Sequence, residues 1–250
     1  MRALNTLTLG RDRALYLGEI PATGWHQHAA PVLLLGLSGR FGLHLPGGQL
    51  ASCRSALIDA SVEHMFDPCG EHVALMYLEP DSPQALSLRG HFGRLGTVVL
   101  DPVSHTPCRS SMDRYLHNFD LPALLRWDMH TAGSIDARVL RSVQAMRAAS
   151  LGAGMQRGMQ RDSVAQIAQL SSSRFNHLFR QEMGVSYRSY RVWTQVRAAM
   201  LALSTQASLT DAALDAGFSD SSHFSNMFRS TFGMTPSSVV RPLRTVSLLR

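Results

Sequence analysis

Phe175-Asn-His-Leu-Phe179-Arg180-Gln-Glu-Met-Gly184-Val-Ser186 is repeated 49 residues later as Phe224-Ser-Asn-Met-Phe228-Arg229-Ser-Thr-Phe-Gly233-Met-Thr235. Both copies follow the pattern F-x-x-x-F-R-x-x-x-G-x-[S/T], and each comes after a short apolar segment. A short helix, a turn and a second helix with a buried aromatic stripe have this spacing in helix-turn-helix motifs. The duplicated pattern therefore predicts two such motifs and favours DNA binding.

The first motif is predicted to span about residues 162–184. Val164, Ala165 and Ala168 can share one face of a short helix, and Ser171 is a suitable N-cap for the helix that follows. An inward stripe is predicted at Phe175, Leu178 and Phe179, which lie at i, i+3 and i+4. Gly184 suits a left-handed C-cap, and Ser186 can cap a long helix over about residues 186–204. The residues predicted to face DNA are Ser172, Ser173, Arg174, Asn176, His177 and Arg180.

The second motif, over about residues 208–233, repeats this construction with one extra residue in its turn. Ser219 or Asp220 can cap the second helix, and Pro236 suits the first turn of a closing helix. The predicted inward stripe is Phe224, Met227 and Phe228. The residues predicted to face DNA are Ser221, Ser222, His223, Ser225, Asn226 and Arg229.

A structural repeat without nucleic acid is the alternative interpretation. Packing alone does not require a glycine bend, a cap and an exposed arginine at matching places twice, so DNA binding is favoured. An adaptor that binds another protein through the repeats also stays open. Duplex binding that weakens steeply with salt would separate the two functions.

The sequence also resembles a known family. Ser163-Val-Ala165-Gln-Ile-Ala-Gln-Leu-Ser171-Ser-Ser-Arg-Phe175-Asn-His-Leu-Phe-Arg-Gln-Glu-Met-Gly184 and Ala213-Leu-Asp-Ala-Gly217-Phe218-Ser-Asp220-Ser-Ser222-His-Phe224-Ser-Asn-Met-Phe228 resemble the two signature segments of AraC/XylS-type transcription regulators. The resemblance implies two recognition helices in successive major grooves of double-stranded DNA and activation through contact with RNA polymerase. Gln195, Asn226 and Val239 stand where the family commonly has Arg, Arg and Tyr, so the second motif is expected to make fewer DNA contacts.

Charge is distributed unevenly along the 250 residues. Residues 134–250 hold 14 Arg and 6 acidic residues, a net charge of +8, whereas residues 1–133 hold 10 Arg and 12 acidic residues, a net charge of −2. A basic half fits a polyanionic partner. We therefore predict a first domain over residues 1–133 and a DNA-binding domain over residues 134–250.

The first half carries the signals of a β-domain. Its apolar runs are four to six residues long and are broken by Gly, Pro, Asp and Ser, as is typical of strands. The runs are Ala14–Leu17, Val32–Leu37, Phe41–Leu45, Ala56–Ile58 and Val73–Leu78. We expect an antiparallel β-barrel or jelly roll over about residues 10–82. Amphipathic helices over Met112–Phe119 and from Leu121 toward His130 are expected to follow and could support a homodimer. The predicted fold is thus α+β with two domains: an antiparallel β-barrel with following helices, and an all-α double helix-turn-helix domain.

Trp25-His26-Gln27-His28, the segment Leu33 to Gly39, and Glu63-His64 resemble, more weakly, the cupin-type sensor domain of AraC-like regulators. In cupin enzymes an H-x-H pair and a later histidine can hold a divalent metal ion. The glutamate expected after His28 is absent, and Val32 stands there. We therefore expect no metal and no cofactor, and interpret Trp25, His26, His28 and His64 as lining a pocket for an unidentified small-molecule effector, or as structural. A metal-dependent cupin enzyme that uses His26, His28 and His64 is the alternative.

Other function classes find little support in the sequence. The sequence has three cysteines without paired spacing, Cys53, Cys69 and Cys108. An odd number without such spacing predicts neither a disulfide framework nor a zinc site, and it favours a reducing compartment. No apolar run approaches the roughly 18 residues of a membrane helix, and Met1–Gly10 lacks the apolar core of a signal peptide. We find no catalytic triad with motif spacing and no phosphate-binding glycine loop. The sequence predicts a cytoplasmic protein that is not an enzyme and does not contact a membrane.

Overall fold

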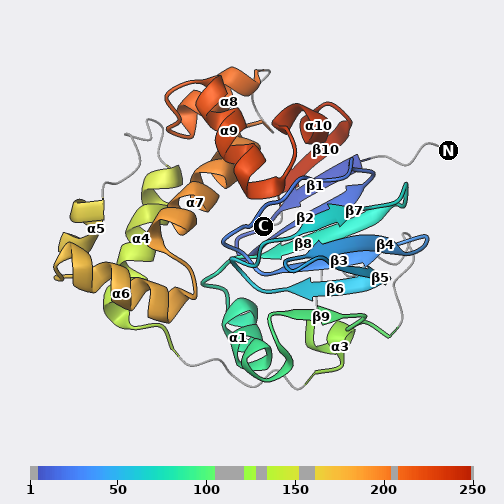
Figure 1. Cartoon of the computed structure of the whole chain (residues 1–250). Coiled ribbons are helices and arrows are strands. Elements are labelled where there is room, and N and C mark those ends of the chain that lie inside the picture. The colour runs from blue at the N-terminus through green and yellow to red at the C-terminus, as the bar shows by residue number, and fades with distance from the viewer. Residues whose placement is uncertain (1–4, 105–120, 128–133, 152–160, 204–207, 249–250) are drawn as a thin grey trace. The chain divides into compact units, whose positions relative to one another are not determined.

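The computed structural model describes residues 5–104, 121–127, 134–151, 161–203 and 208–248 (Figure 1). The chain divides into two compact units, residues 1–132 together with 229–250, and residues 133–228. The helix expected over Met112–Phe119 and the chain from 128 to 133 lie outside the described residues. No helix among the described ranges is long and apolar enough to cross a bilayer.

Strands make up most of the first unit. Each apolar run predicted from the sequence lies largely within one of them, namely β2, β3, β4, β6 and β8, which confirms those five predictions. The remaining strands were not predicted because they are short or rich in polar residues. The bounds are β1 (Asn5–Leu9), β2 (Arg13–Gly18), β3 (Val32–Gly36), β4 (Phe41–Leu45), β5 (Gln49–Cys53), β6 (Ser55–Ile58), β7 (Met65–Asp67), β8 (Val73–Leu78), β9 (Val98–Leu100) and β10 (Leu243–Leu248).

The strands form two open sheets, so the predicted closed barrel is wrong. In the described part of the chain, one sheet has seven strands in the order β10-β1-β2-β8-β3-β6-β9, and the other has three in the order β5-β4-β7. One cause is local: after β8 the chain enters helix α1 (Pro83–Leu95), which begins at the N-cap Ser82 and at Pro83, instead of returning as a further strand. The α+β class itself is confirmed.

The seven-stranded sheet also contains the C-terminal strand of the chain. β10 pairs in parallel with β1, from Asn5 opposite Leu243 to Leu9 opposite Leu248, and the Thr8 hydroxyl lies 3.0 Å from that of Ser247. The prediction that the C-terminal domain is all-α is therefore wrong. β10 pairs with a strand at the other end of the chain, and local sequence patterns carry no signal for such a partner.

Helices cover one face of this sheet. Alternate residues of β2, β3, β6 and β8 form a buried cluster with α1 and with α3 (Leu121–Leu125), whose prediction from Leu121, Leu124 and Leu125 is confirmed. The strand residues of the cluster are Leu15, Leu17, Leu33, Leu35, Leu57, Ala74, Met76 and Leu78. Side chains alternate along a strand, so Tyr77, which lies between Met76 and Leu78, points to the opposite face.

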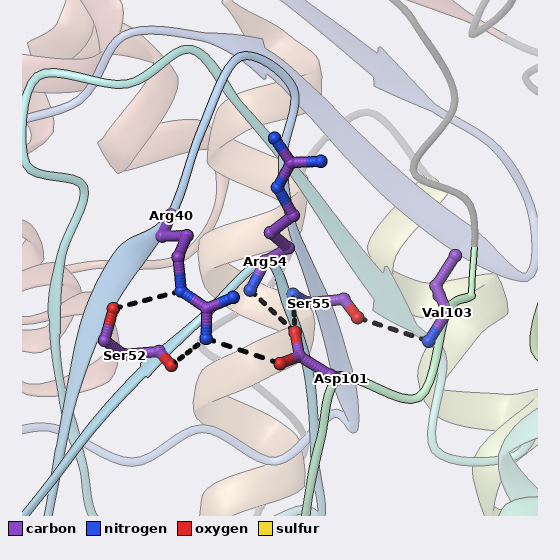
Figure 2. A network of polar contacts seen from close by, with 6 residues as sticks. All are labelled: Arg40, Ser52, Arg54, Ser55, Asp101 and Val103. Atoms are coloured by element: carbon purple, nitrogen blue, oxygen red, sulfur yellow. Dashed lines mark hydrogen bonds and ion pairs between the residues drawn. The ribbon is translucent and has the colours of Figure 1, made fainter.

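A polar network joins the two sheets at the edge formed by β9 (Figure 2). One carboxylate oxygen of Asp101 accepts the backbone N–H groups of Arg54 and Ser55, at 2.7 and 3.0 Å. The other carboxylate oxygen lies 3.6 Å from the Arg40 guanidinium, which also donates to Ser52. Asp101 therefore satisfies backbone groups between β5 and β6 and holds the chain that follows β9.

Helices make up the second unit. Val139, Val143 and Met146 of the first helix are buried. The long helix expected over about 186–204 is α7, with Ser186 as its N-cap. The helices described in the second unit are α4 (Ala137–Leu151), α5 (Arg161–Ile167), α6 (Ser172–Met183), α7 (Tyr187–Ala202), α8 (Leu209–Asp215) and most of α9 (Ser221–Phe232). The last four residues of α9 and the whole of α10 (Pro236–Val240) belong to the first unit.

Candidate nucleic-acid interface

Helix α6 begins and ends at the predicted residues. The Ser171 hydroxyl accepts the backbone N–H of Arg174 at 3.4 Å, which confirms Ser171 as the N-cap. Gly184 is left-handed with φ of 74°, and its N–H donates to the carbonyl of Arg180 at 2.9 Å. The cap and the glycine thus satisfy backbone groups at both ends, and they fix the length of the helix.

Helix α9 is capped by Asp220 rather than by Ser219. The Asp220 carboxylate accepts the backbone N–H of His223 at 2.7 Å, and this hydrogen bond is the main cause of the lowered pKa of Asp220. The Ser219 hydroxyl donates to Asp220 at 2.9 Å and lies 3.1 Å from Nδ1 of His223. Ser219 and Asp220 therefore hold the first turn of α9 and orient the His223 ring.

The helices turn the same face inward in both motifs. Phe175 and Phe179 of α6, and Phe224 and Phe228 of α9, are buried, with ring centroids 5.4 and 5.7 Å apart within each pair. Leu178 and Met227, which were also predicted to be inward, are only half-buried. The aromatic residues thus form the buried stripe, and the third apolar position lies at its border.

The exposure of α6 and α9 repeats residue by residue over their first ten positions. None of the predicted DNA-facing residues is buried. Those half-buried are Ser172, Asn176, Ser221 and Ser225, and those exposed are Ser173, Arg174, His177, Arg180, Ser222, His223, Asn226 and Arg229. Each helix therefore presents a polar outer face with an exposed arginine at the same position, Arg180 or Arg229.

The short helices and the turns that precede α6 and α9 repeat as well. The sequence offset between their two copies is one residue smaller than the 49 residues that separate matching positions of α6 and α9. The N–H of Leu170 donates to Ala165 and that of Phe218 to Ala213, both at 3.0 Å. The extra residue of the second motif lies between this turn and the cap Asp220, as the sequence predicted. The left-handed residue of the first turn, Gln169, was not predicted, because glutamine carries no local signal for positive φ.

Two of the departures from the family pattern have structural roles. Gln195 of α7 is buried, and its side-chain N–H₂ lies 3.5 Å from the carbonyl of Gly217, in the turn of the second motif. Val239 of α10 is buried. Neither side chain is exposed to solvent as a DNA contact would require, whereas Asn226 is exposed.

A second candidate site lies in the first unit, where three of the four predicted effector residues meet. His26 and His64 exchange backbone hydrogen bonds of 3.0 Å. The ring centroid of His64 lies 4.3 Å from that of His26 and 5.3 Å from that of His28. All three histidines are buried, whereas Trp25 is 48% exposed and is an exposed neighbour in sequence rather than part of the cluster.

Burial keeps these rings neutral. It lowers the pKa of His26 and lowers that of His28 well below its usual value, and it lowers the pKa of His64 to about 4. Charge repulsion within the cluster acts in the same direction for His28 and His64. At neutral pH each ring therefore offers one N–H donor and one nitrogen lone pair.

Comparison with known proteins agrees with this geometry. Residues 164–241 match the family described as a helix-turn-helix domain. The arabinose operon regulatory protein of Escherichia coli (strain K12) is 41% identical over 76 residues, which cover 30% of this chain and 26% of that protein. The helix-turn-helix region of this chain is therefore similar to that of AraC/XylS-type transcription regulators. The resemblance predicted from the two signature segments is thereby confirmed.

Two further comparisons cover most of this chain. The probable transcriptional regulator LumQ of Photobacterium leiognathi is 25% identical over 229 residues, which cover 85% of this chain and 90% of that protein. A crystal structure of ToxT from Vibrio cholerae O395 has a TM-score of 0.59 at 11% identity and covers 94% of this chain and 100% of that one. At this identity the likeness concerns the fold alone. A further ToxT structure is bound to (E)-4-(8-methylnaphthalen-1-yl)but-3-enoic acid.

The share of these relatives that is matched differs greatly. The matched segment spans about a quarter of the arabinose operon regulator, 26% of its length. The regulators named here are not enzymes, and none of these comparisons supports the cupin-enzyme alternative.

Proposed function

We propose that this protein is a sequence-specific DNA-binding transcription regulator that responds to a small-molecule effector. The observation that carries the proposal is the repeated exposure of α6 and α9, which gives two helices of equal length the same polar, cationic outer face. Recognition helices of helix-turn-helix proteins present such faces to the major groove. The DNA-binding region corresponds in this proposal to residues 134–250 and the sensor region to residues 1–133.

The first turn of each helix would read bases. Ser173, Arg174, Asn176 and His177 would do so on α6, and Ser222, His223, Ser225 and Asn226 on α9, with Ser172 and Ser221 at the helix starts. Asparagine pairs well with the edge of adenine and arginine with that of guanine. Base specificity is thus assigned to the N-terminal halves of both helices.

Phosphate contacts are assigned to the arginines further along. Arg180 and Arg229 lie one turn beyond the base-reading residues, are exposed, and occupy matching positions in the two helices. Contacts to phosphates fix the position of a protein on the duplex without carrying sequence information. These residues would set affinity and salt dependence.

The effector would bind in the first unit, at or beside the cluster of His26, His28 and His64. ToxT, which shares the fold, has been solved with a small carboxylic acid bound, and three buried neutral rings are unusual without a ligand-binding or packing role. We further propose a homodimer that acts in the cytoplasm and contacts RNA polymerase, as the family resemblance implies.

The test is selection of bound sequences from a random duplex pool by the full chain, followed by binding to the selected site at increasing salt. We expect a defined site and an affinity that falls steeply with salt, since each neutralised phosphate contributes about −0.9 to the log–log slope. Recovery of no enriched sequence, together with duplex binding that is absent at low salt, would leave the adaptor interpretation in its place.

A further inference from the structure

The three buried histidines have the geometry of a metal-ligand set. One ring nitrogen from each of His26, His28 and His64 lies within 4.8 Å of the other two. In a tetrahedral site with metal–nitrogen bonds of about 2.0–2.1 Å, two ligand nitrogens stand about 3.3 Å apart. Ring shifts of about 1 Å would close the difference, which is within the rotation range of a histidine side chain.

Backbone carbonyls fix the tautomer of all three rings. Nδ1 of His26 lies 2.9 Å from the Gly24 carbonyl, Nδ1 of His28 2.6 Å from that of Ala30, and Nδ1 of His64 2.9 Å from that of Val62. A carbonyl oxygen only accepts, so each Nδ1 carries the proton and donates it. Each Nε2 then holds the lone pair. Metal-bound histidines in proteins usually have this arrangement, in which the second nitrogen donates to a carbonyl or carboxylate.

We propose that His26, His28 and His64 bind one divalent transition metal ion, of the class that prefers imidazole ligands, such as zinc or cobalt. Three imidazoles are a sufficient protein ligand set for zinc, with a fourth position left to water or to a small ligand. The absence of the glutamate, at whose place Val32 stands, therefore does not exclude a metal, contrary to the expectation from sequence.

The site lies next to the C-terminal end of a predicted recognition helix. The backbone N–H of Gly24 donates to the carbonyl of Gly233, which follows α9, at 2.8 Å. His28 also packs edge-on against Tyr77, which in turn packs against Phe232 of α9. All these residues belong to the first compact unit. A metal ion on the histidines would therefore stabilise the segment that ends α9.

Metal binding by the three histidines can be tested without DNA, so the test does not depend on the proposed regulator function. Only the biological role of the metal ion rests on that function. The full chain is treated with a chelator, desalted, and titrated with Co²⁺ and with Zn²⁺. We expect saturation at one ion per chain, visible Co²⁺ absorption of the intensity typical of four-coordinate sites, and displacement of Co²⁺ by Zn²⁺. His64→Gln and His28→Gln should each weaken binding by roughly tenfold or more, since each removes a ligand.

His44→Gln is the matched control, because His44 lies on β4 of the same unit and outside the cluster. It should bind metal as the unaltered chain does, and circular dichroism checks that each variant is folded. The proposal is overturned if the unaltered chain does not bind Co²⁺, if His64→Gln binds it equally well, or if a thiolate-to-cobalt charge-transfer band shows that cysteines hold the ion. Duplex binding is measured separately, so a failure of either function is recognised by itself.

Discussion

Gln169 and Gly217 occupy the same position in the turns of the two helix-turn-helix motifs, and both are left-handed, with φ of 56° and 82°. The N–H of each donates at 2.9 Å to the carbonyl three residues earlier, Gln166 and Leu214 respectively. The turn geometry is therefore the same in both copies, although only the second has the residue that adopts this conformation without strain.

Replacing Gln169 with glycine should stabilise the second unit. The left-handed conformation costs a non-glycine residue about 1–2 kcal/mol, while a glycine adds about 0.5–1 kcal/mol of unfolded-state entropy. We expect the free energy of unfolding to rise by about 0.5–1 kcal/mol for Gln169→Gly, measured by urea denaturation. Gly217→Gln is the reciprocal variant and should lower it. A loss of stability in Gln169→Gly would show that the exposed glutamine side chain has a stabilising contact of its own.

Gly233 and Gly184 end α9 and α6 in the same left-handed conformation, with φ of 68° and 74°. A Cβ on Gly233 would lie 2.4 Å from the Gly24 carbonyl oxygen and 2.8 Å from Nδ1 of His26. Gly233→Ala should therefore cost more than the roughly 1–2 kcal/mol that the left-handed conformation alone imposes. Gly184→Ala serves as the control for the backbone cost. Thermal unfolding of the two variants compares them, and equal losses would argue against the packing of Gly233 on Gly24.

Asn176 and Arg180 should differ in how they affect DNA binding. Asn176→Ala is expected to cost about 1–3 kcal/mol on the selected site and little on random duplex, because a base contact is lost. Arg180→Ala should weaken binding to both and flatten the salt dependence by about one unit of slope. Fluorescence anisotropy with both duplexes at several salt concentrations measures this. Equal losses on both duplexes for Asn176→Ala would reject its assignment as a base-reading residue.

The cysteines should differ in reactivity. Cys53 is buried at the end of β5, and burial is the main cause that raises its pKa to about 12, so its reactive thiolate is scarce at neutral and mildly alkaline pH. Cys69 is exposed. Brief treatment of the folded protein with iodoacetamide at pH 8 should label Cys69 and spare Cys53, as peptide mass spectrometry can show. Substantial labelling of Cys53 in the folded protein would contradict this prediction and would mean that β5 opens readily.

The helical half could be predicted closely because its signals are local. The aromatic pairs of α6 and α9, the cap at Ser171 and the glycine at Gly184 each act within one or two turns of the chain, and hydrogen bonds between near neighbours complete them. The choice between Ser219 and Asp220 as cap could not be made from sequence, since both residue types accept the N–H of a first turn. Which face of each helix is buried was determined by the spacing of the phenylalanines.

The strand half could be predicted only in part because its contacts join distant residues. The sequence by itself determined the apolar runs of the central strands and the H-x-H pair His26 and His28. Only the tertiary structure decided that β10 pairs with β1, that the sheets stay open, and that Trp25 faces solvent beside the histidine cluster. Strand pairing depends on which distant backbone edges are brought together and on the burial that the whole fold gains, and neither quantity can be read from a short stretch of sequence.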